Sequence, residues 1–290
     1  MNNQTALVLE GGGMRCVFTA GVLDCFMQAG ISFPYTIAVS GGCINGLSYM
    51  SGQQGRSRDI MIKYLQQEKY IGFMNYLQNG SFINFRTIFE KYDETGIPFN
   101  FEAYRHNPNR FVVVTSNCLT GKAMYLEEKQ DKQQLYRLCE ASSSLPVYCP
   151  LVEVNGIPMY DGGVCDAIPY QRPLDEGFNK LIVVLTRRKE YRKDEQKEYT
   201  PHLLFRNFPM LRFALGDMHY RYNRMLEKIQ ILEDMGKVVV IRPSDEMGVD
   251  TLTRNKDNLV RLYEEGFRVA HESLESIRNT NIVHIKESAL

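Results

Sequence analysis

The stretch Thr5–Cys16, TALVLEGGGMRC, places an apolar run directly before three consecutive glycines. The run predicts a buried β-strand, and the apolar residues after the glycines recur with helical spacing as far as Gly30. The same order returns at Pro34–Gly42, PYTIAVSGG, where a second apolar run meets Ser40 and a small-residue helix follows. A strand, a glycine turn and a helix in repeated order predict a parallel sheet with helices on both faces.

Further apolar runs extend this predicted sheet, and an Asn-Gly turn joins two of them into a hairpin: residues 111–114, 124–126, 151–154, 158–160 and 181–185. We therefore expect an α/β fold, a three-layer α/β/α core with a central, mostly parallel sheet, over residues 1–186. The charge-dense run 187–195 marks its boundary. Residues 187–290 predict an α-rich C-terminal extension with one strand at 238–241, packed on the core.

Composition excludes several classes of partner. The chain carries 34 basic and 34 acidic side chains, so no net field attracts nucleic acid. Its aliphatic runs are far shorter than the ~20 residues of a membrane span, and Met1–Thr5 lacks the basic start of a secretory signal. Seven scattered cysteines without a CxxC pair favour reduced thiols over disulfides or a zinc site. We expect a cytoplasmic protein that needs no metal or other cofactor.

Gly11, Gly12 and Gly13 form a candidate anion-binding loop. Consecutive glycines let the backbone approach a ligand and point N–H groups into one concavity at a helix N-terminus. The anion is either a nucleotide phosphate or the oxyanion of acyl transfer. The loop does not end in Gly-Lys-Ser/Thr, and Cys16 stands where a dinucleotide loop has glycine. A nucleotide- or ligand-binding module built on this loop stays the alternative, beside a tight turn without function.

Ser40 lies in Ala38-Val39-Ser40-Gly41-Gly42, between a predicted strand and a predicted helix. A serine on such a sharp turn is held away from the backbone, with helix N-terminal N–H groups beneath it, which suits a nucleophile. The usual elbow has glycine two residues before the serine, and alanine has the smallest Cβ that can replace it. A buried serine that only caps the following helix is the other interpretation.

Asp161 is the candidate base, because two glycines after a carboxylate let the backbone turn sharply and hold the acid at a cleft. A plain loop turn is the other interpretation of Asp-Gly-Gly. No histidine has a glycine turn beside it: His106, His202, His219, His271 and His284. An α/β-hydrolase triad with one of the four later histidines is formally available. That fold, however, builds several strands before its nucleophile, and only two precede Ser40.

Together these pieces resemble the patatin-like phospholipase family. Its members carry a Gly-Gly-Gly-x-Arg/Lys-Gly loop after the first strand, a Gly-x-Ser-x-Gly elbow after the second, and a later Asp-Gly-Gly or Asp-Gly-Ala. Gly11–Arg15, Ala38–Gly42 and Asp161–Gly163 match these motifs in the same order. Ala141–Pro146 and Pro169 resemble further family features, and the resemblance covers roughly residues 5–186.

Two small residues depart from the family motifs. Cys16 replaces the glycine after Arg15, and Ala38 replaces the first glycine of the elbow. Both changes affect the fine geometry of the site more than the existence of activity. A catalytically dead patatin-like protein is the alternative that they leave open.

The resemblance implies a serine acyl hydrolase that cleaves lipid ester bonds, of the phospholipase A or lysophospholipase type. Ser40 would attack the ester carbonyl, Asp161 would accept its proton directly, and an acyl-enzyme would form. The N–H groups of Gly11–Gly13 would form the oxyanion hole. The site should be partly desolvated, since burial raises the pKa of an aspartate and makes it a stronger base.

The expected partner is a lipid or another ester, with transient contact at the inner face of the membrane. Arg15 is a candidate contact for a substrate phosphate, with a structural ion pair as its alternative. Residues 70–104 hold ten of the 32 Phe and Tyr side chains. We expect this aromatic segment to form core helices, with a lid or a wall of the acyl-chain site as the alternative. Phe205–Arg224 mixes apolar and basic residues and predicts a buried amphipathic helix or a bilayer contact.

Overall fold

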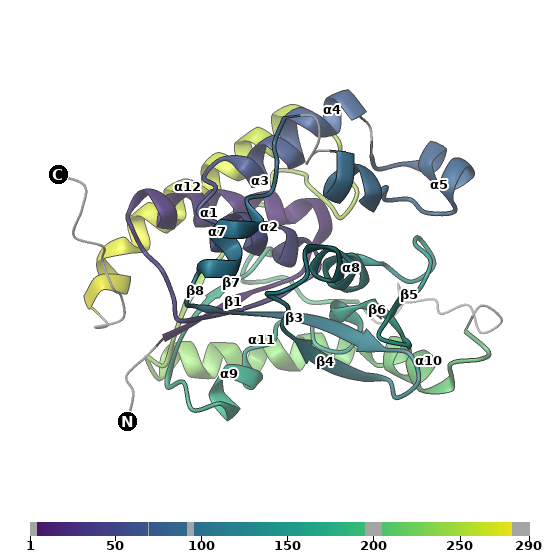
Figure 1. Ribbon diagram of the computed structural model, residues 1–290. Coiled ribbons are helices and arrows are strands. Elements are labelled where there is room, and N and C mark those ends of the chain that lie inside the picture. Colours follow the sequence, from purple (N-terminus) through teal and green to yellow (C-terminus); the bar gives the residue numbers. More distant parts are fainter. Residues whose placement is uncertain (1–4, 69, 92–95, 195–204, 280–290) are drawn as a thin grey trace.

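Eight strands form one sheet at the centre of the molecule (Figure 1). The computed structural model describes residues 5–68, 70–91, 96–194 and 205–279. The strands are β1 (Thr5–Leu9), β2 (Tyr35–Val39), β3 (Arg110–Asn117), β4 (Lys122–Leu126), β5 (Val152–Val154), β6 (Ile157–Asp161), β7 (Lys180–Val184) and β8 (Val238–Ile241). Their order is β5-β6-β3-β2-β1-β7-β8, and β4 pairs with β3 outside this path.

The sheet is mostly parallel, as the sequence predicts. β1 lies at its centre with β2 and β7 parallel on either side, and β3 and β8 continue the parallel part outward. β4, β5 and β6 join antiparallel beside β3. The glycine loop after β1 and the turn after β2 therefore both lie at the carboxyl edge of the parallel strands.

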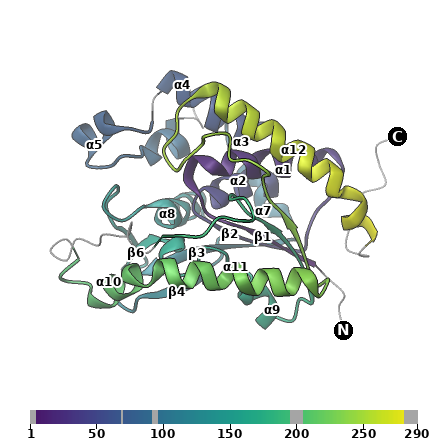
Figure 2. The same ribbon diagram turned by 180° about the vertical axis from the view of Figure 1, so that it is seen from behind.

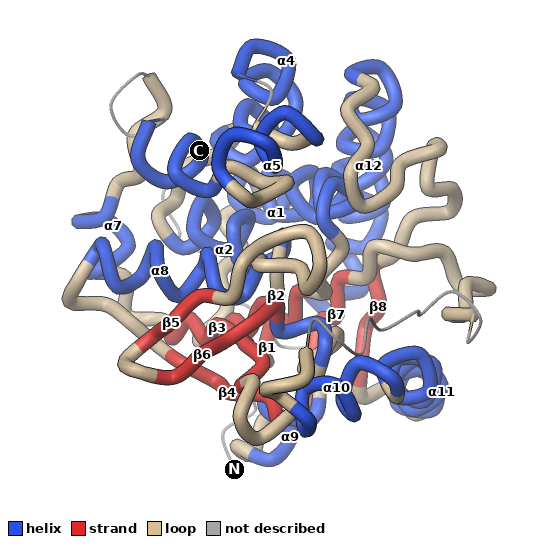
Figure 3. Tube along the Cα trace, turned by 90° about the vertical axis from the view of Figure 1, so that its right-hand side faces the viewer, coloured by secondary structure: helices blue, strands red, loops and turns tan. Residues whose placement is uncertain are grey.

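Helices cover both faces of the sheet. They are η1 (Gly13–Cys16), α1 (Val17–Gln28), α2 (Gly41–Met50), α3 (Arg56–Arg58), η2 (Asp59–Tyr64), α4 (Leu65–Glu68), α5 (Phe73–Asn79), η3 (Thr87–Lys91), α7 (Phe101–His106), α8 (Lys132–Ser143), η4 (Gly162–Val164), α9 (Gln171–Asp175), α10 (Pro209–Gly216), α11 (Met218–Asp234) and α12 (Lys256–Asn279). Figures 1 and 3 show α1, α2 and α12 over one face and α11 over the other.

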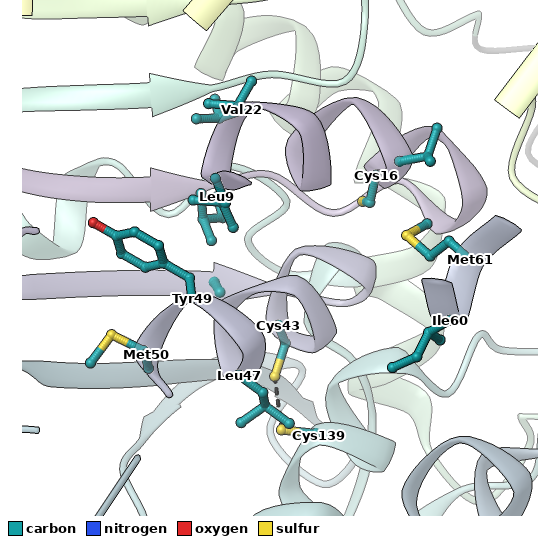
Figure 4. Packing of buried hydrophobic residues seen from close by; sticks show 14 of the residues in the cluster. Leu9, Cys16, Val22, Cys43, Leu47, Tyr49, Met50, Ile60, Met61 and Cys139 are labelled. Carbon is teal, nitrogen blue, oxygen red and sulfur yellow. Dashed lines mark hydrogen bonds between the residues drawn. The ribbon is translucent and has the colours of Figure 1, made fainter. Parts of the chain in front are cut away.

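The apolar runs of the central strands are continuous because both faces of each strand are buried. In β1, Leu7 and Leu9 pack into the cluster that α1, α2 and α12 cover. Ala6 and Val8 point to the opposite side and share a cluster with side chains of α11. Figure 4 shows part of the first cluster, where Cys43 of α2 and Cys139 of α8 bring their sulfurs to 2.9 Å.

α12 packs directly on α1, and two glycines allow the backbones to touch (Figure 2). A Cβ placed on Gly21 would lie 2.1 Å from the carbonyl oxygen of Tyr263. A Cβ on Gly266 would lie 2.1 Å from the carbonyl oxygen of Phe18. The C-terminal region therefore contributes a strand to the sheet through β8 and a helix to the core through α12. The domain boundary at residue 187 stays a prediction.

We predict that Gly266→Ala destabilises the protein by about 1 to 3 kcal/mol, because the added methyl group forces α12 away from α1. A loss of stability would be informative, because replacing glycine by alanine at an open helix position normally stabilises a protein by about 1 kcal/mol. The free energy of unfolding in urea measures the effect. Gly216→Ala is the matched control, because no heavy atom lies within 4 Å of a Cβ placed there. Equal stability of the two variants would contradict the close approach.

Candidate active site

Ser40 occupies a strained turn between β2 and α2. Its backbone has φ 54° and ψ −129°, one of four non-glycine residues with positive φ in the described ranges. L-residues avoid this region, so the surrounding contacts must hold the backbone there. The residue is buried, and its backbone turns sharply between the strand and the helix.

Ser142 holds the strained backbone in place. Its hydroxyl oxygen accepts a hydrogen bond from the Ser40 N–H at 2.9 Å, and the hydroxyl donates to the carbonyl of Val114 at 2.7 Å. The carbonyl of Ser40 in turn accepts from the N–H of Cys43 at 2.9 Å. Ser142 belongs to the stretch Ala141–Pro146 that the sequence singled out, but its partner could not be read from the sequence.

Small residues let α2 begin directly against the glycine loop. A Cβ on Gly41 would lie 2.8 Å from the carbonyl oxygen of Gly13, and a Cβ on Gly42 would lie 2.7 Å from that of Glu10. The sulfur of Cys16 fills the space beside Gly41, 2.9 Å from the same added Cβ. Cys16, the departure from the family motif, is thus accommodated because position 41 carries no side chain.

Asp161 lies at the end of β6, in hydrogen-bond contact with Ser40. The Ser40 hydroxyl donates to Oδ2 of Asp161 at 2.6 Å, across 121 residues of sequence. The other carboxylate oxygen accepts from the N–H of Gly163 at 2.7 Å, so the first turn after the strand orients the group. The backbone N–H of Asp161 donates to the carbonyl of Ser144 at 2.8 Å.

Burial raises the pKa of Asp161 to about 6, and the hydrogen bonds from Ser40 and Gly163 oppose that rise. Only 3% of this side chain is exposed, so desolvation is the larger effect. The carboxylate is therefore a stronger base than an exposed aspartate and is still ionised at neutral pH.

The glycine loop lies against Ser40 on the other side. A Cβ on Gly11 would come within 3.0 Å of the Ser40 Cβ. The N–H of Gly11 donates to the carbonyl of Ala167 at 3.4 Å. The N–H groups of Gly12 and Gly13 have no acceptor among the residues that the structure describes. These two donors, and not all three, are available to an anion beside Ser40.

Thr251, from the loop before α12, supports the glycine loop from outside. Its carbonyl accepts from the N–H of Met14 at 3.0 Å, and its hydroxyl accepts from the Arg15 guanidinium at 3.0 Å. Gly13 has φ +57°, and a Cβ there would lie 2.5 Å from the Thr251 carbonyl oxygen. Glycine is required at position 13 for both reasons.

Glu10, directly before the glycine loop, is a second buried carboxylate. It accepts from the Tyr222 hydroxyl of α11 at 2.6 Å and from the N–H and hydroxyl of Thr186, the latter at 3.0 Å. Burial raises the pKa of Glu10, and these hydrogen bonds oppose the rise. The sequence analysis did not identify Glu10, although an acidic residue at the end of a buried strand was a usable signal. No sequence signal pointed to Tyr222 or Thr251 as residues that contact the site.

Arg15 is buried beside the same loop, and it has no carboxylate partner in the described part of the chain. Its exposed fraction is 9%, and within the described residues no acidic oxygen lies within 4.0 Å of it. Among the residues that the structure describes, its only side-chain hydrogen bond goes to Thr251, and its Nε has no partner there. The structural ion pair considered from the sequence is therefore absent from the described part of the chain.

A pocket of about 590 Å³ opens above Ser40 and Asp161. The glycine loop forms part of its floor, and three basic side chains, Arg15, Arg187 and Lys193, line it. A narrow apolar cavity of about 50 Å³ begins on the other side of Ser40 and runs between α2 and the 60–88 segment, lined by Ile44, Ile60, Met61, Ile71, Phe85 and Ile88. Ser40 thus lies between a partly basic space and an apolar one.

Histidine is missing from the described walls of this pocket. His106, His219 and His271 lie elsewhere, while His202 and His284 fall outside the described residues. The described side chains also contain no cluster of three or more His, Cys, Asp or Glu that could hold a metal ion. Within the same ranges, every helix is too short or too polar to span a bilayer.

Comparison with known proteins places this geometry in a family. The family model described as patatin-like phospholipase matches residues 7–174. The chain belongs to this family. A second model, a domain of unknown function (DUF6363), matches residues 209–281. This second region supplies Tyr222 and Thr251, the two residues that contact Glu10 and the glycine loop.

Curated relatives are distant and longer. An uncharacterized Escherichia coli protein, YjjU, is 28% identical over 68% of this patatin-like chain and 54% of its own length. Lysophospholipase NTE1 of Cryptococcus neoformans is 28% identical over 62% of this chain and 11% of its own length. The chain thus spans about half of the first relative and about a tenth of the second. The crystal structure of VipD from Legionella pneumophila superposes over 94% of this chain and 67% of VipD, with a TM-score of 0.50 and 13% identity, which supports the fold.

We predict that Asp161→Asn makes the folded protein more stable at pH 7, by about 3 kcal/mol from a pKa raised from 3.8 to about 6. The folded state binds the Asp161 proton more tightly than the unfolded state. Wild-type stability therefore falls as pH rises from about 4 to about 6, whereas asparagine removes that loss. Urea unfolding at pH 7 and at pH 4 measures it. The variant should gain at pH 7 and match the wild type at pH 4; a loss at pH 7 would contradict the desolvation argument.

Proposed function

We propose that this patatin-like protein is a serine acyl hydrolase that cleaves lipid ester bonds through Ser40 and Asp161. The observation that carries the proposal is the 2.6 Å hydrogen bond from the Ser40 hydroxyl to a buried carboxylate, on a strained elbow at the floor of a pocket. Such an arrangement gives the hydroxyl a proton acceptor within direct reach.

The proposed reaction has two steps, acylation of Ser40 and hydrolysis of the acyl-enzyme. Ser40 Oγ attacks the ester carbonyl while its proton moves to Oδ2 of Asp161. The C–O bond then breaks, and the leaving alcohol takes that proton, which leaves an acyl group on Ser40. Water attacks the acyl-enzyme, gives one proton to Asp161, and releases the carboxylic acid as the proton returns to Ser40 Oγ. No third residue is needed to carry the proton.

The N–H groups of Gly12 and Gly13 would stabilise the tetrahedral oxyanion. They lie in a loop that touches Ser40, and they make no other described hydrogen bond. The removal of one such donor typically lowers the rate by a factor of about 100 to 1,000. Gly11 supports this arrangement through its contacts with Ser40 and Ala167, so the oxyanion hole consists of two of the three glycines expected from the sequence.

The two spaces beside Ser40 suit a lipid ester. The apolar cavity is positioned for the acyl chain, and the larger pocket is positioned for the alcohol part of the substrate. Arg15, whose Nε has no partner among the described residues, is the residue that we assign to a phosphate in that alcohol part. A nucleotide-binding module and a catalytically dead relative are the alternatives that the next experiment separates.

We predict that a fluorophosphonate probe labels the wild-type protein covalently at Ser40 and does not label Ser40→Ala. Hydrolysis of a short-chain ester should fall at least about a thousandfold in the same variant. Labelling mapped by mass spectrometry and ester turnover are the two measurements. Ser273→Ala on α12 is the control and should behave as wild type. Absence of labelling in the wild type, with the fold intact, would favour a dead relative or a nucleotide binder.

We predict that kcat/KM rises with pH through an apparent pKa near 6, because only ionised Asp161 accepts the Ser40 proton. Activity should fall about tenfold per pH unit below that value and level off above it. Asp166 is the matched control, since burial raises its pKa to about 6 as well, and its Oδ2 accepts from Tyr125 instead of Ser40. An Asp166→Asn variant should keep the profile; a profile that moved with Asp166 would contradict the assignment.

A further inference from the structure

Large apolar side chains are exposed around the pocket mouth. They lie on α5, on the loop before β5 and on α10, which Figure 3 shows on the face that looks toward the viewer. We call this set the apolar rim: Phe73, Met74, Tyr76, Leu77, Val147, Tyr148, Leu151, Met210 and Phe213. Large exposed apolar side chains gathered on one face are typical of an interaction site.

α5 is the most exposed part of the rim. None of its residues is buried, and Phe73, Met74 and Leu77 are 60%, 64% and 61% exposed. The surrounding stretch Tyr70–Phe85 contains no charged residue and no histidine. The expectation that the aromatic segment forms core helices therefore fails at α5, although Tyr70 and Phe85 are buried on either side of it.

The rim is continuous with the pocket that holds Ser40. Phe82 packs edge-on against Tyr148 with ring centroids 5.4 Å apart, and its N–H donates to the Tyr148 carbonyl at 2.8 Å. Phe82 also contacts Phe73 and Tyr76 of α5. Val147 and Tyr148 line the pocket itself, so one connected apolar surface leads from α5 to the site.

Basic residues border the other side of the mouth. The segment Arg187–Asp194 carries five Lys or Arg against two acids, and Phe205–Arg224 carries four Arg against one acid. Residues of both segments line the pocket, among them Arg187 and Lys193. Arg187 is ion-paired with Glu246, so the excess positive charge beside this opening comes from the other Lys and Arg of the two segments.

We propose that the apolar rim is a docking surface for an anionic lipid bilayer, with α5 inserted among the acyl chains and the basic segments against the headgroups. An uncharged apolar helix beside a basic border matches the two layers of such an interface. The inference rests on the proposed function for its purpose, since docking there would bring the pocket mouth to the lipid. The sequence analysis considered residues 205–224 as the bilayer contact, whereas we now assign the main contact to α5. α10, within residues 205–224, contributes Met210 and Phe213.

Vesicle binding tests the surface without turnover. In a Ser40→Ala background, Phe73→Glu with Leu77→Glu should lower the fraction bound to vesicles of equal phosphatidylcholine and phosphatidylglycerol at least about tenfold. The matched control is Ile231→Glu with Met235→Glu, which are 57% and 58% exposed with the same spacing, on the last turn of α11 and at its C-cap. Three residues, 235–237, separate this end of α11 from β8, and β8 is the edge strand at the opposite end of the sheet from β5. The control should therefore bind vesicles as the parent does.

Several results would overturn the proposal. They are parent protein that stays free of vesicles, equal loss in both double variants, and a dimer of the parent that Phe73→Glu with Leu77→Glu converts to monomer. The last result would make the rim an interface between copies of the chain. Binding that is equal on pure phosphatidylcholine would overturn the anionic part of the proposal.

The design separates this proposal from the catalytic one. In the Ser40-containing protein, the Phe73→Glu and Leu77→Glu changes should leave hydrolysis of soluble p-nitrophenyl butyrate unchanged and lower hydrolysis of vesicle lipid. If Ser40 is not a nucleophile, both hydrolysis assays fail while the vesicle-binding difference persists. If the rim is not a docking surface, hydrolysis persists and the binding difference is absent.

Discussion

The backbone of Ser40 is the constraint on which the site depends. A positive φ at a non-glycine residue is unfavourable by itself, so contacts from several elements have to over-determine it. Ser142 of α8 binds its N–H, and α2 begins immediately after it against the glycine loop. The need for close approach explains why Gly41 and Gly42 follow the serine.

Two buried carboxylates set the electrostatics around this turn. Asp161 contacts the proposed nucleophile, whereas Glu10 lies behind the glycine loop and is bound by Thr186 and Tyr222. Burial raises the pKa of both, but the consequences differ. Asp161 gains basicity that the proposed reaction uses, while Glu10 links the end of β1 to α11. The C-terminal region is therefore structurally joined to the site through side-chain contacts.

Much of the fold was predictable because both faces of the central strands are buried. Continuous apolar runs at β1, β2 and β7, each bounded by a turn, leave few other arrangements than a covered parallel sheet. Ser40, Asp161 and the glycine loop could also be selected as candidate site residues, because glycines at fixed offsets mark sharp turns at strand ends. Their contact was not predictable from either segment alone, since 121 residues separate the two side chains.

Other features depended on long-range packing. The sequence around Arg15 does not indicate whether an acidic side chain contacts it. The fold shows that its described side-chain partner is Thr251. The segment around α5 is equally apolar whether it packs inside or stands out, and the structure leaves α5 exposed. The strands, the turns and the chemically able side chains are predictable from local segments, because sterics and periodicity act within a few residues. Which of those side chains meet depends on the complete fold, because segments far away in the chain supply burial and hydrogen-bond partners.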